Sequence, residues 1–117
     1  LMYVDAGHGH WAIRRANGTS EAPPTPDGFL VGIDANSEYT NATLEINSGD
    51  RIILFSDGIP EQQAHTEEQY GVERVYELIA ASPTAEEDVK RLLESVIEWG
   101  GSTDLDDDTT IVSLGLI

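Results

Sequence analysis

The sequence predicts an α+β fold, with a mainly antiparallel sheet and two helices on one of its faces. Three observations lead to this class. Short segments with strand character fill residues 1–56, two amphipathic helical patterns fill residues 72–100, and a β-branched segment follows at 109–116. Because the helices come in one block and do not alternate with strands, we expect both to cover the same face of the sheet.

The composition restricts the class of protein. The chain has 117 residues and carries 22 acidic residues against 6 Lys and Arg, which gives a formal net charge of −16. Nucleic acids and anionic membranes attract clustered cations, so neither is expected as a partner. There is no cysteine, and no apolar run approaches the ~20 residues of a membrane span. We expect one domain over residues 1–117 and a cytoplasmic location.

The N-terminal part is expected to form two strands, at 1–4 and 11–15, joined through a glycine turn. Asn17 and Gly18 mark the next turn. Residues 19–28 are rich in Ser, Pro, Asp and Gly, so they are expected to form a surface loop.

The middle of the chain is expected to form a meander around a central strand at 52–55. Four apolar residues in a row predict that this strand is buried on both faces. Residues 38–46, followed by a turn at 47–50, are expected to form a hairpin with it. The apolar segment 29–33 is expected to pack on the core as a strand or turn. The candidates for the buried side of segment 38–46 are Tyr39, Leu44 and Ile46.

Two helices are predicted by apolar stripes at helical spacing. The first stripe covers positions 72, 75, 76 and 79 and is closed by Ser82 and Pro83. The second opens on the capping-box residues Thr84 and Glu87, follows positions 89, 92, 93, 96 and 97, and ends at two glycines, Gly100 and Gly101.

Acidic residues stand at the ends of two predicted strands. Asp57 follows the central strand, and Asp107 and Asp108 precede the last one. If these strands are antiparallel neighbours, the three acids gather at one edge of the sheet. Two carboxylates about 4 Å apart repel by about 4 kcal/mol at an effective dielectric near ~20, so such a cluster needs water, a proton or a cation. Oxygen ligands favour Mg²⁺ or Mn²⁺.

Other sites are less consistent with the sequence. The acidic run can be a solvated charged loop, and its position opposite Asp57 is what favours a cation site. An EF-hand is excluded, because Thr109 and Gly115 stand where its glycine and glutamate belong. His8 and His10 could share a strand face as zinc ligands, but a turn with a hydrogen-bonded histidine is the favoured interpretation.

Five motifs resemble, in order and spacing, the later motifs of the SpoIIE-type (sporulation stage II E) serine/threonine phosphatases. That family is a bacterial relative of the metal-dependent type 2C protein phosphatases. The resemblance covers essentially the whole chain. The motifs are Ala6-Gly7-His8, Val31-Gly32-Ile33, the run from Ser48 to Glu61, Tyr70-Gly71-Val72-Glu73-Arg74, and the run from Asp107 to Val112.

The resemblance implies part of an α-β-β-α sandwich, with two Mn²⁺ or Mg²⁺ ions held by carboxylates at the sheet edge. It implies that Asp57 and Asp107 are metal ligands and that Asp108 is a ligand through water or a supporting neighbour. Gly58 and Glu61 match the same motifs and are expected to support the ligands without touching the metal. The implied reaction is hydrolysis of phosphoserine or phosphothreonine by metal-activated water, and the implied substrate is a phosphorylated anti-sigma-factor antagonist or a similar regulatory protein.

One departure limits what this stretch is expected to do alone. The family's earlier Asp-x-x-Gly-His-Gly element, which supplies another metal-binding acid, has no match before Asp57. We therefore expect the C-terminal portion of a phosphatase domain, weakly active or inactive by itself and joined to other domains of a longer chain. The alternatives are a catalytically silent phosphatase-like module that binds a regulatory partner, and an unrelated acidic α+β domain that binds a cation for stability.

Overall fold

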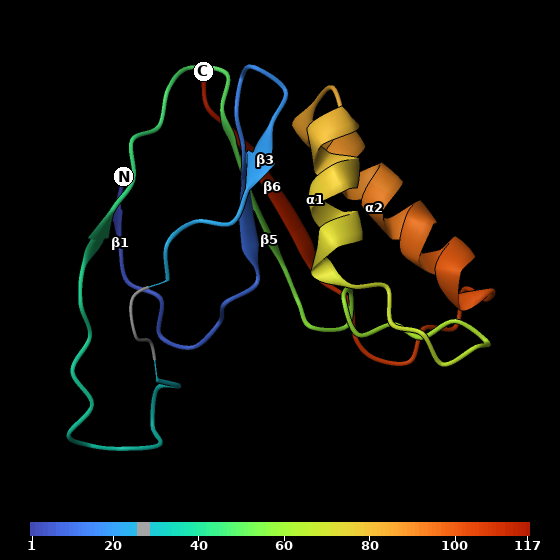
Figure 1. Cartoon of the computed structure of the whole chain (residues 1–117), viewed down its shortest axis with the longest axis horizontal. Helices are drawn as coiled ribbons and strands as arrows, with labels where there is room; N and C mark the ends of the chain where they lie inside the picture. The colour runs from blue at the N-terminus through green and yellow to red at the C-terminus, as the bar shows by residue number, and fades with distance from the viewer. Residues whose placement is uncertain (26–28) are drawn as a thin grey trace.

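The computed structural model describes residues 1–25 and 29–117. Figure 1 shows two helices packed along one side of a sheet, and on the other side an extended arm that contains residues 1–10 and 29–46. The elements, in chain order, are β1 (Met2–Tyr3), β2 (Trp11–Arg14), β3 (Ser20–Glu21), β4 (Ala42–Thr43), β5 (Arg51–Phe55), α1 (Val72–Ala81), α2 (Ala85–Gly100) and β6 (Ile111–Gly115).

The main sheet has the strand order β3-β2-β5-β6, and each neighbouring pair is antiparallel. In the β5-β6 ladder, Arg51 pairs with Gly115 and Phe55 pairs with Ile111. The predicted α+β class, the antiparallel sheet and the pairing of the central strand with the last strand are therefore confirmed.

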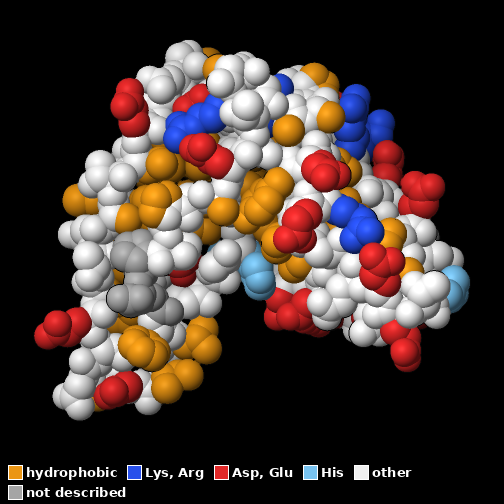
Figure 2. Space-filling model, viewed as in Figure 1, with side chains coloured by type: hydrophobic (Ala, Val, Ile, Leu, Met, Phe, Trp, Pro, Cys, Tyr) orange, Lys and Arg blue, Asp and Glu red, His pale blue; other side chains and the backbone are white. Residues whose placement is uncertain are grey.

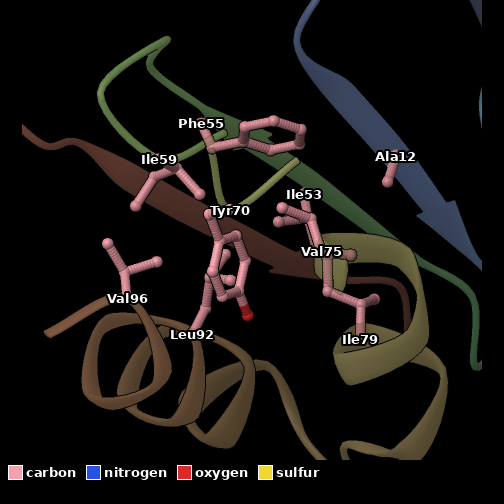
Figure 3. Close-up of a cluster of buried hydrophobic side chains, with 9 residues drawn as sticks. All are labelled: Ala12, Ile53, Phe55, Ile59, Tyr70, Val75, Ile79, Leu92 and Val96. Atoms are coloured by element: carbon pink, nitrogen blue, oxygen red, sulfur yellow. The ribbon is translucent and has the colours of Figure 1, made fainter. Parts of the chain in front are cut away.

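The main hydrophobic core lies between this sheet and the two helices (Figure 3). Ile53 and Phe55 are the β5 residues that face the helices, and both are almost fully buried. Alternate residues of a strand point to opposite faces, which explains why Ile52 and Leu54 pack into a second cluster with Trp11 and others. Both faces of β5 thus carry apolar contacts, as the sequence predicts. The helix residues of the main core are Val75, Ile79, Leu92 and Val96.

The two helices begin and end where the sequence predicts. The Thr84 side chain accepts a hydrogen bond from the Glu87 backbone N–H at 3.1 Å, which caps the first turn of α2. Gly101 ends α2 in a left-handed conformation, φ 74°, which glycine adopts without strain. Within the described residues, neither helix is long and apolar enough to cross a membrane.

A buried ion pair fastens the helices to the sheet. Arg51, at the start of β5, donates to both carboxylate oxygens of Asp88 in α2, at 2.7 and 2.9 Å. Ser113 of β6 donates to the same carboxylate at 2.7 Å. The guanidinium also donates to the carbonyl oxygen of Ser82 between the helices, at 2.7 Å. Because both charges are buried and paired, this contact fixes how α2 sits on β5 and β6.

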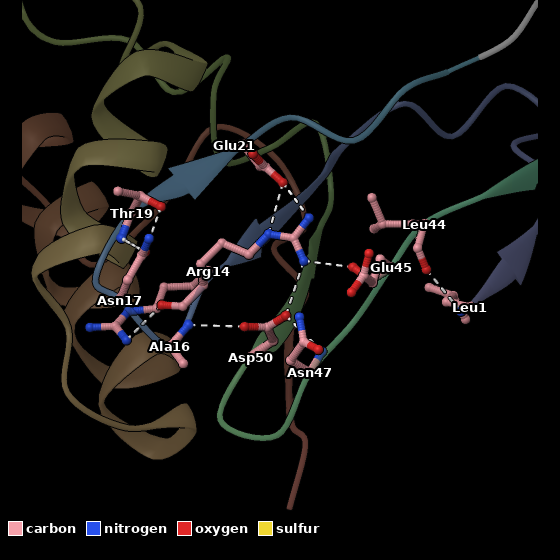
Figure 4. Close-up of polar contacts among 11 residues, drawn as sticks. Leu1, Arg14, Ala16, Asn17, Thr19, Glu21, Leu44, Glu45, Asn47 and Asp50 are labelled. Carbon is pink, nitrogen blue, oxygen red and sulfur yellow. Dashed lines mark hydrogen bonds and ion pairs between the residues drawn. The ribbon is translucent and has the colours of Figure 1, made fainter.

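A second buried carboxylate, Asp50, organises the turn before β5 (Figure 4). It accepts hydrogen bonds from the backbone N–H groups of Asn47 and Ala16 at 3.0 and 2.9 Å, and from Arg15 at 3.0 Å. Burial alone would raise the pKa of Asp50, but these hydrogen bonds and the positive charge of Arg15 outweigh it and hold that pKa below its ordinary value.

Strand pairing in the N-terminal half differs from the prediction. The two strands expected to form one glycine-linked unit belong to different sheets, because β1 pairs with β4 and β2 pairs with β3 and β5. The hairpin expected between 38–46 and the central strand is wrong for the same reason, so the middle of the chain is not a meander. Only Ala42–Thr43 of that segment is a strand. Leu44 is buried and Ile46 is half-buried against the second cluster, as predicted, whereas Tyr39 is exposed.

Two further expectations for this region are wrong. Ser20–Glu21 lies in the expected loop 19–28 but forms β3, which pairs with β2 across the predicted Asn17-Gly18 turn. Residues 26–28 of that loop lie outside the described residues. The apolar segment 29–33 does not pack on the core, and its large side chains are 55 to 73% exposed. Figure 2 shows hydrophobic side chains at the surface of the arm.

Candidate functional site

The β5-β6 ladder brings the two acidic segments to the same edge of the main sheet. Phe55 at the end of β5 pairs with Ile111 at the start of β6. The chain that leaves β5 through Asp57 therefore runs beside the chain that enters β6 through Asp107 and Asp108. The register of β5 and β6 therefore places the two acidic segments side by side, as the sequence predicts.

Ser56 joins the two segments by hydrogen bonds beyond the regular ladder. Its backbone N–H donates to the carbonyl oxygen of Thr110 at 3.0 Å, and its Oγ accepts from the Thr110 N–H at 2.9 Å. The hydroxyl also donates to the carbonyl oxygen of Asp108 at 3.3 Å. Ser56 therefore continues the pairing of β5 and β6 up to the acidic residues.

Gly58 allows the two segments to touch. A Cβ atom at this position would lie 2.4 Å from the carbonyl oxygen of Asp108 and 3.4 Å from the Thr109 hydroxyl. Any larger residue would force the backbones apart. The Asp57-Gly58 turn is further fixed by the Glu61 N–H, which donates to the carbonyl oxygen of Asp57 at 3.0 Å.

The four carboxylates expected at the site are all exposed. These are Asp57, Glu61, Asp107 and Asp108. The ion pairs formed among the described residues include none of them. Asp107 accepts a hydrogen bond from the Asp108 backbone N–H at 2.7 Å, which orients its carboxylate. Exposed carboxylate oxygens of this kind are the ligand atoms that Mg²⁺ and Mn²⁺ prefer.

A hollow of about 310 Å³ opens beside the turn. Among the predicted residues, Gly58, Glu61 and Asp107 line it, together with Gln62, Gln63, Gln69 and Asp106. Asp57 and Asp108, although both are described, are not among its lining residues. The structure thus gathers the predicted residues at one edge but divides them between this hollow and the adjacent surface.

The ligand set for a metal ion is incomplete within the part of the chain that the structure describes. No group of three or more His, Asp or Glu side chains there lies close enough together to hold an ion. The donor chemistry of the exposed carboxylates fits a hard divalent cation, but the described residues do not by themselves bring together a set of metal ligands.

The sequence prediction missed one contact at this edge. The side-chain amide of Gln62 pairs with Asp106, which places a buried residue between the two acidic segments. The sequence signal for it is weak, because Gln62 lies outside any stretch with regular periodicity. His8 behaves as expected for a turn, since its Nε2 contacts the carbonyl oxygen of His10 at 3.1 Å.

Comparison with known proteins gives this geometry a context. Among solved structures, the chain is similar to the PP2C phosphatase domain, with a fragment of the regulatory domain, of the cell fate determinant SpoIIE from Bacillus subtilis. The TM-score is 0.77 with 22% sequence identity, over 98% of this chain and 32% of that one. The structure of the RsbU and RsbW domains of Rv1364c from Mycobacterium tuberculosis matches with a TM-score of 0.71 and 21% identity, over 96% of this chain and 31% of that one.

Among characterised proteins, the chain is 29% identical over 113 residues to protein IcfG from Synechocystis sp. (strain ATCC 27184 / PCC 6803 / Kazusa). The match covers 95% of this chain but only 18% of IcfG. The chain therefore corresponds in length to a small part of that relative and to about a third of the two solved chains.

The fold class is α+β, with two helices on antiparallel strands, and the fold is similar to that of the PP2C domain of SpoIIE. Residues 1–116 match the sequence profile described as Stage II sporulation protein E (SpoIIE). The chain belongs to the SpoIIE family, and the resemblance noted from its motifs is confirmed.

Proposed function

We propose that this chain is the C-terminal portion of a metal-dependent serine/threonine phosphatase domain in a longer protein. The observation that carries the proposal is the contact between the Asp57-Gly58 turn and the backbone of Asp108. It puts acidic residues from two distant segments at one edge of the sheet, where oxygen ligands for a divalent cation are required. Membership of the SpoIIE family supports the same function.

In this proposal Asp57 and Asp107 are ligands for Mn²⁺ or Mg²⁺, together with acids that lie outside this chain. When bound, two such ions lower the pKa of a coordinated water and neutralise phosphoryl oxygens, so no protein nucleophile is needed. Asp108 supports Asp107 through its N–H, or binds a cation through water. Gly58 allows the two segments to stay in contact. The Glu61 backbone N–H stabilises the turn by donating to the carbonyl oxygen of Asp57.

The proposed substrate is a protein phosphorylated on serine or threonine, of the anti-sigma-factor antagonist type, and the proposed setting is signal transduction in the cytoplasm. This substrate class follows from the family resemblance. The exposed acids at the site would repel a phosphoprotein unless cations neutralised them, which is consistent with a metal-dependent reaction.

The test is phosphate release from a phosphorylated antagonist protein by the full-length protein with Mn²⁺ present. Asp57→Asn and Asp107→Asn each remove one charged ligand oxygen and should reduce the rate by at least about a hundredfold. Asp104→Asn is the matched control, since Asp104 is an exposed acid of the same loop and should leave the rate unchanged. Equal rates in wild type, Asp57→Asn and Asp107→Asn would contradict the proposal.

A second candidate function is a phosphatase-like module that binds a regulatory partner without catalysis. The observation in its favour is that no three metal-binding side chains meet within residues 1–25 and 29–117. Binding of the partner with equal affinity with and without Mn²⁺, by a full-length protein that releases no phosphate, would favour this second function.

A further inference from the structure

Gln62 and Asp106 form a two-way contact between the loop after β5 and the loop before β6. The Gln62 amide Nε2 donates to Asp106 Oδ2 at 3.0 Å, and the Asp106 backbone N–H donates to Gln62 Oε1 at 3.0 Å. The backbone N–H of Gln63 donates to the same carboxylate oxygen at 3.3 Å. We call this pair of residues the clasp.

The clasp is fixed on the Gln62 side. Gln62 is only 3% exposed, and its carbonyl oxygen accepts a hydrogen bond from the Tyr70 N–H at 2.9 Å. The end of α2 also packs closely against the Gln62 side chain, since a Cβ atom on Gly100 would lie 2.8 Å from Gln62 Nε2. The glutamine amide is therefore held between α2 and the loop before β6, and it has little freedom to move away from Asp106.

Only an amide satisfies both halves of the clasp. The contact requires a donor toward the Asp106 carboxylate and an acceptor toward the Asp106 N–H, which glutamine supplies on one group. A glutamate at position 62 would set two carboxylates against each other in a buried place. An apolar residue would leave the Asp106 N–H without its acceptor and would remove one donor to the Asp106 carboxylate.

From these contacts we infer that Gln62 is a positioning residue for the proposed metal site. It fixes the position of Asp106 by hydrogen bonding. The adjacent Asp107 and Asp108 are thereby kept where the Asp108 backbone contacts the turn at Gly58. In this inference Gln62 acts through Asp106 and is not itself a ligand of the cation. The inference rests on the proposed function, because it assigns to Gln62 the placement of a ligand of that site.

The consequence is a specific effect on metal binding. Groups that orient metal ligands typically change metal affinity by about 10- to 100-fold when they are replaced. Loosening the clasp should therefore raise the Mn²⁺ concentration needed for half-saturation. It should also release the backbone of 104–110, whose N–H groups would exchange faster with solvent.

The experiment uses the full-length protein and two measurements, Mn²⁺ titration by calorimetry and hydrogen exchange of segment 104–110. Gln62→Glu should weaken Mn²⁺ binding by about tenfold or more and speed exchange in the segment. Adding Asp106→Asn should restore part of both, because the asparagine amide can donate to the new carboxylate but cannot at the same position accept from the Gln63 N–H. Thr66→Glu is the charge control, since it adds a negative charge to an exposed side chain of the same loop that does not line the hollow, and it should change neither.

A second pair of variants keeps the test valid if Gln62→Glu does not fold. Asp106 is exposed, so Asp106→Ala should fold and still weaken Mn²⁺ binding and speed exchange, whereas Asp106→Asn keeps an acceptor for Gln62 and should do neither. Unchanged exchange in both Gln62→Glu and Asp106→Ala would overturn the clasp, whatever the metal affinity. Failure of the wild-type protein to bind Mn²⁺ would instead overturn the proposed function, and with it the positioning role.

Discussion

Gly58 lies so close to Asp108 that a methyl group on its α-carbon would sit 2.4 Å from the Asp108 carbonyl oxygen. The obstacle is backbone, which cannot rotate away as a flexible side chain can. The approach of these two residues therefore sets the separation between the two acidic segments at the candidate site.

Replacing Gly58 by alanine should push the segments apart. We expect a loss of stability of about 1 to 3 kcal/mol, together with weaker Mn²⁺ binding by the full-length protein. Gly115→Ala is the matched control, because Gly115 lies in β6 with its nearest neighbouring atom 4.0 Å from the added Cβ. Thermal unfolding of the two variants checks the prediction, and equal stability of Gly58→Ala and wild type would contradict it.

The buried pair of Arg51 and Asp88 should contribute more to stability than a surface pair in the same helix. Asp88→Asn leaves the Arg51 guanidinium buried without a counter-charge, which should cost about 3 to 5 kcal/mol. Glu87→Gln breaks the neighbouring pair with Arg91, whose side chain is 47% exposed, and should have a much smaller effect. Denaturant unfolding of both variants measures the difference, and similar losses would show that burial does not set the strength of the pair.

Asp50 should make part of the stability depend on pH. Its pKa in the folded protein lies below the ordinary value of 3.8, so its charged form stabilises the fold at pH values above that value. The contribution is lost as the pH falls through the lowered pKa. The stability advantage of wild type over Asp50→Asn should therefore be largest above pH ~5 and shrink toward lower pH. Unfolding measured across this range checks it, and a constant difference would exclude the effect.

Two adjacent leucines of α2 should respond differently to truncation. Leu92 is fully buried in the main core, so Leu92→Ala should cost about 2 to 5 kcal/mol. Leu93 is 38% exposed, and Leu93→Ala should cost clearly less. The two variants have the same composition and the same change in helix propensity. A similar decrease in melting temperature for both variants would contradict the described packing of α2 on the sheet.

The sequence predicts the helices and the central strand because their signals are local. An apolar stripe, a capping threonine and a terminal glycine all act within a few residues of one another. The burial of Asp88 could also have been inferred, since it stands four residues before Leu92 and eight before Val96, on the same helical face. Its partner Arg51 lies 37 residues away and gives no comparable signal.

The partners of the short strands could not be predicted in the same way. Alternation shows that a segment has a buried side, but not which strand lies beside it, and β1, β3 and β4 have only two residues each. The apolar pattern of 29–33 predicts contact with a core, but its large side chains make no such contact within the described residues and are exposed. The juxtaposition of the segments that carry Asp57 and Asp107 was predictable because two five-residue strands flank it, whereas the contact of Gln62 with Asp106 depends on loops.

Because the β5-β6 register brings their segments together, we propose that Asp57 and Asp107 of the proposed site bind the same divalent cation. The most direct measurement is calorimetric titration of Mn²⁺ into the full-length protein, compared among wild type, Asp57→Asn, Asp107→Asn and the double variant, with Asp104→Asn as control. The prediction is that each single variant loses most of the affinity, that the double variant loses little more, because ligands of one ion act together, and that Asp104→Asn binds normally. Binding of Mn²⁺ by Asp57→Asn or Asp107→Asn with wild-type affinity would contradict the claim.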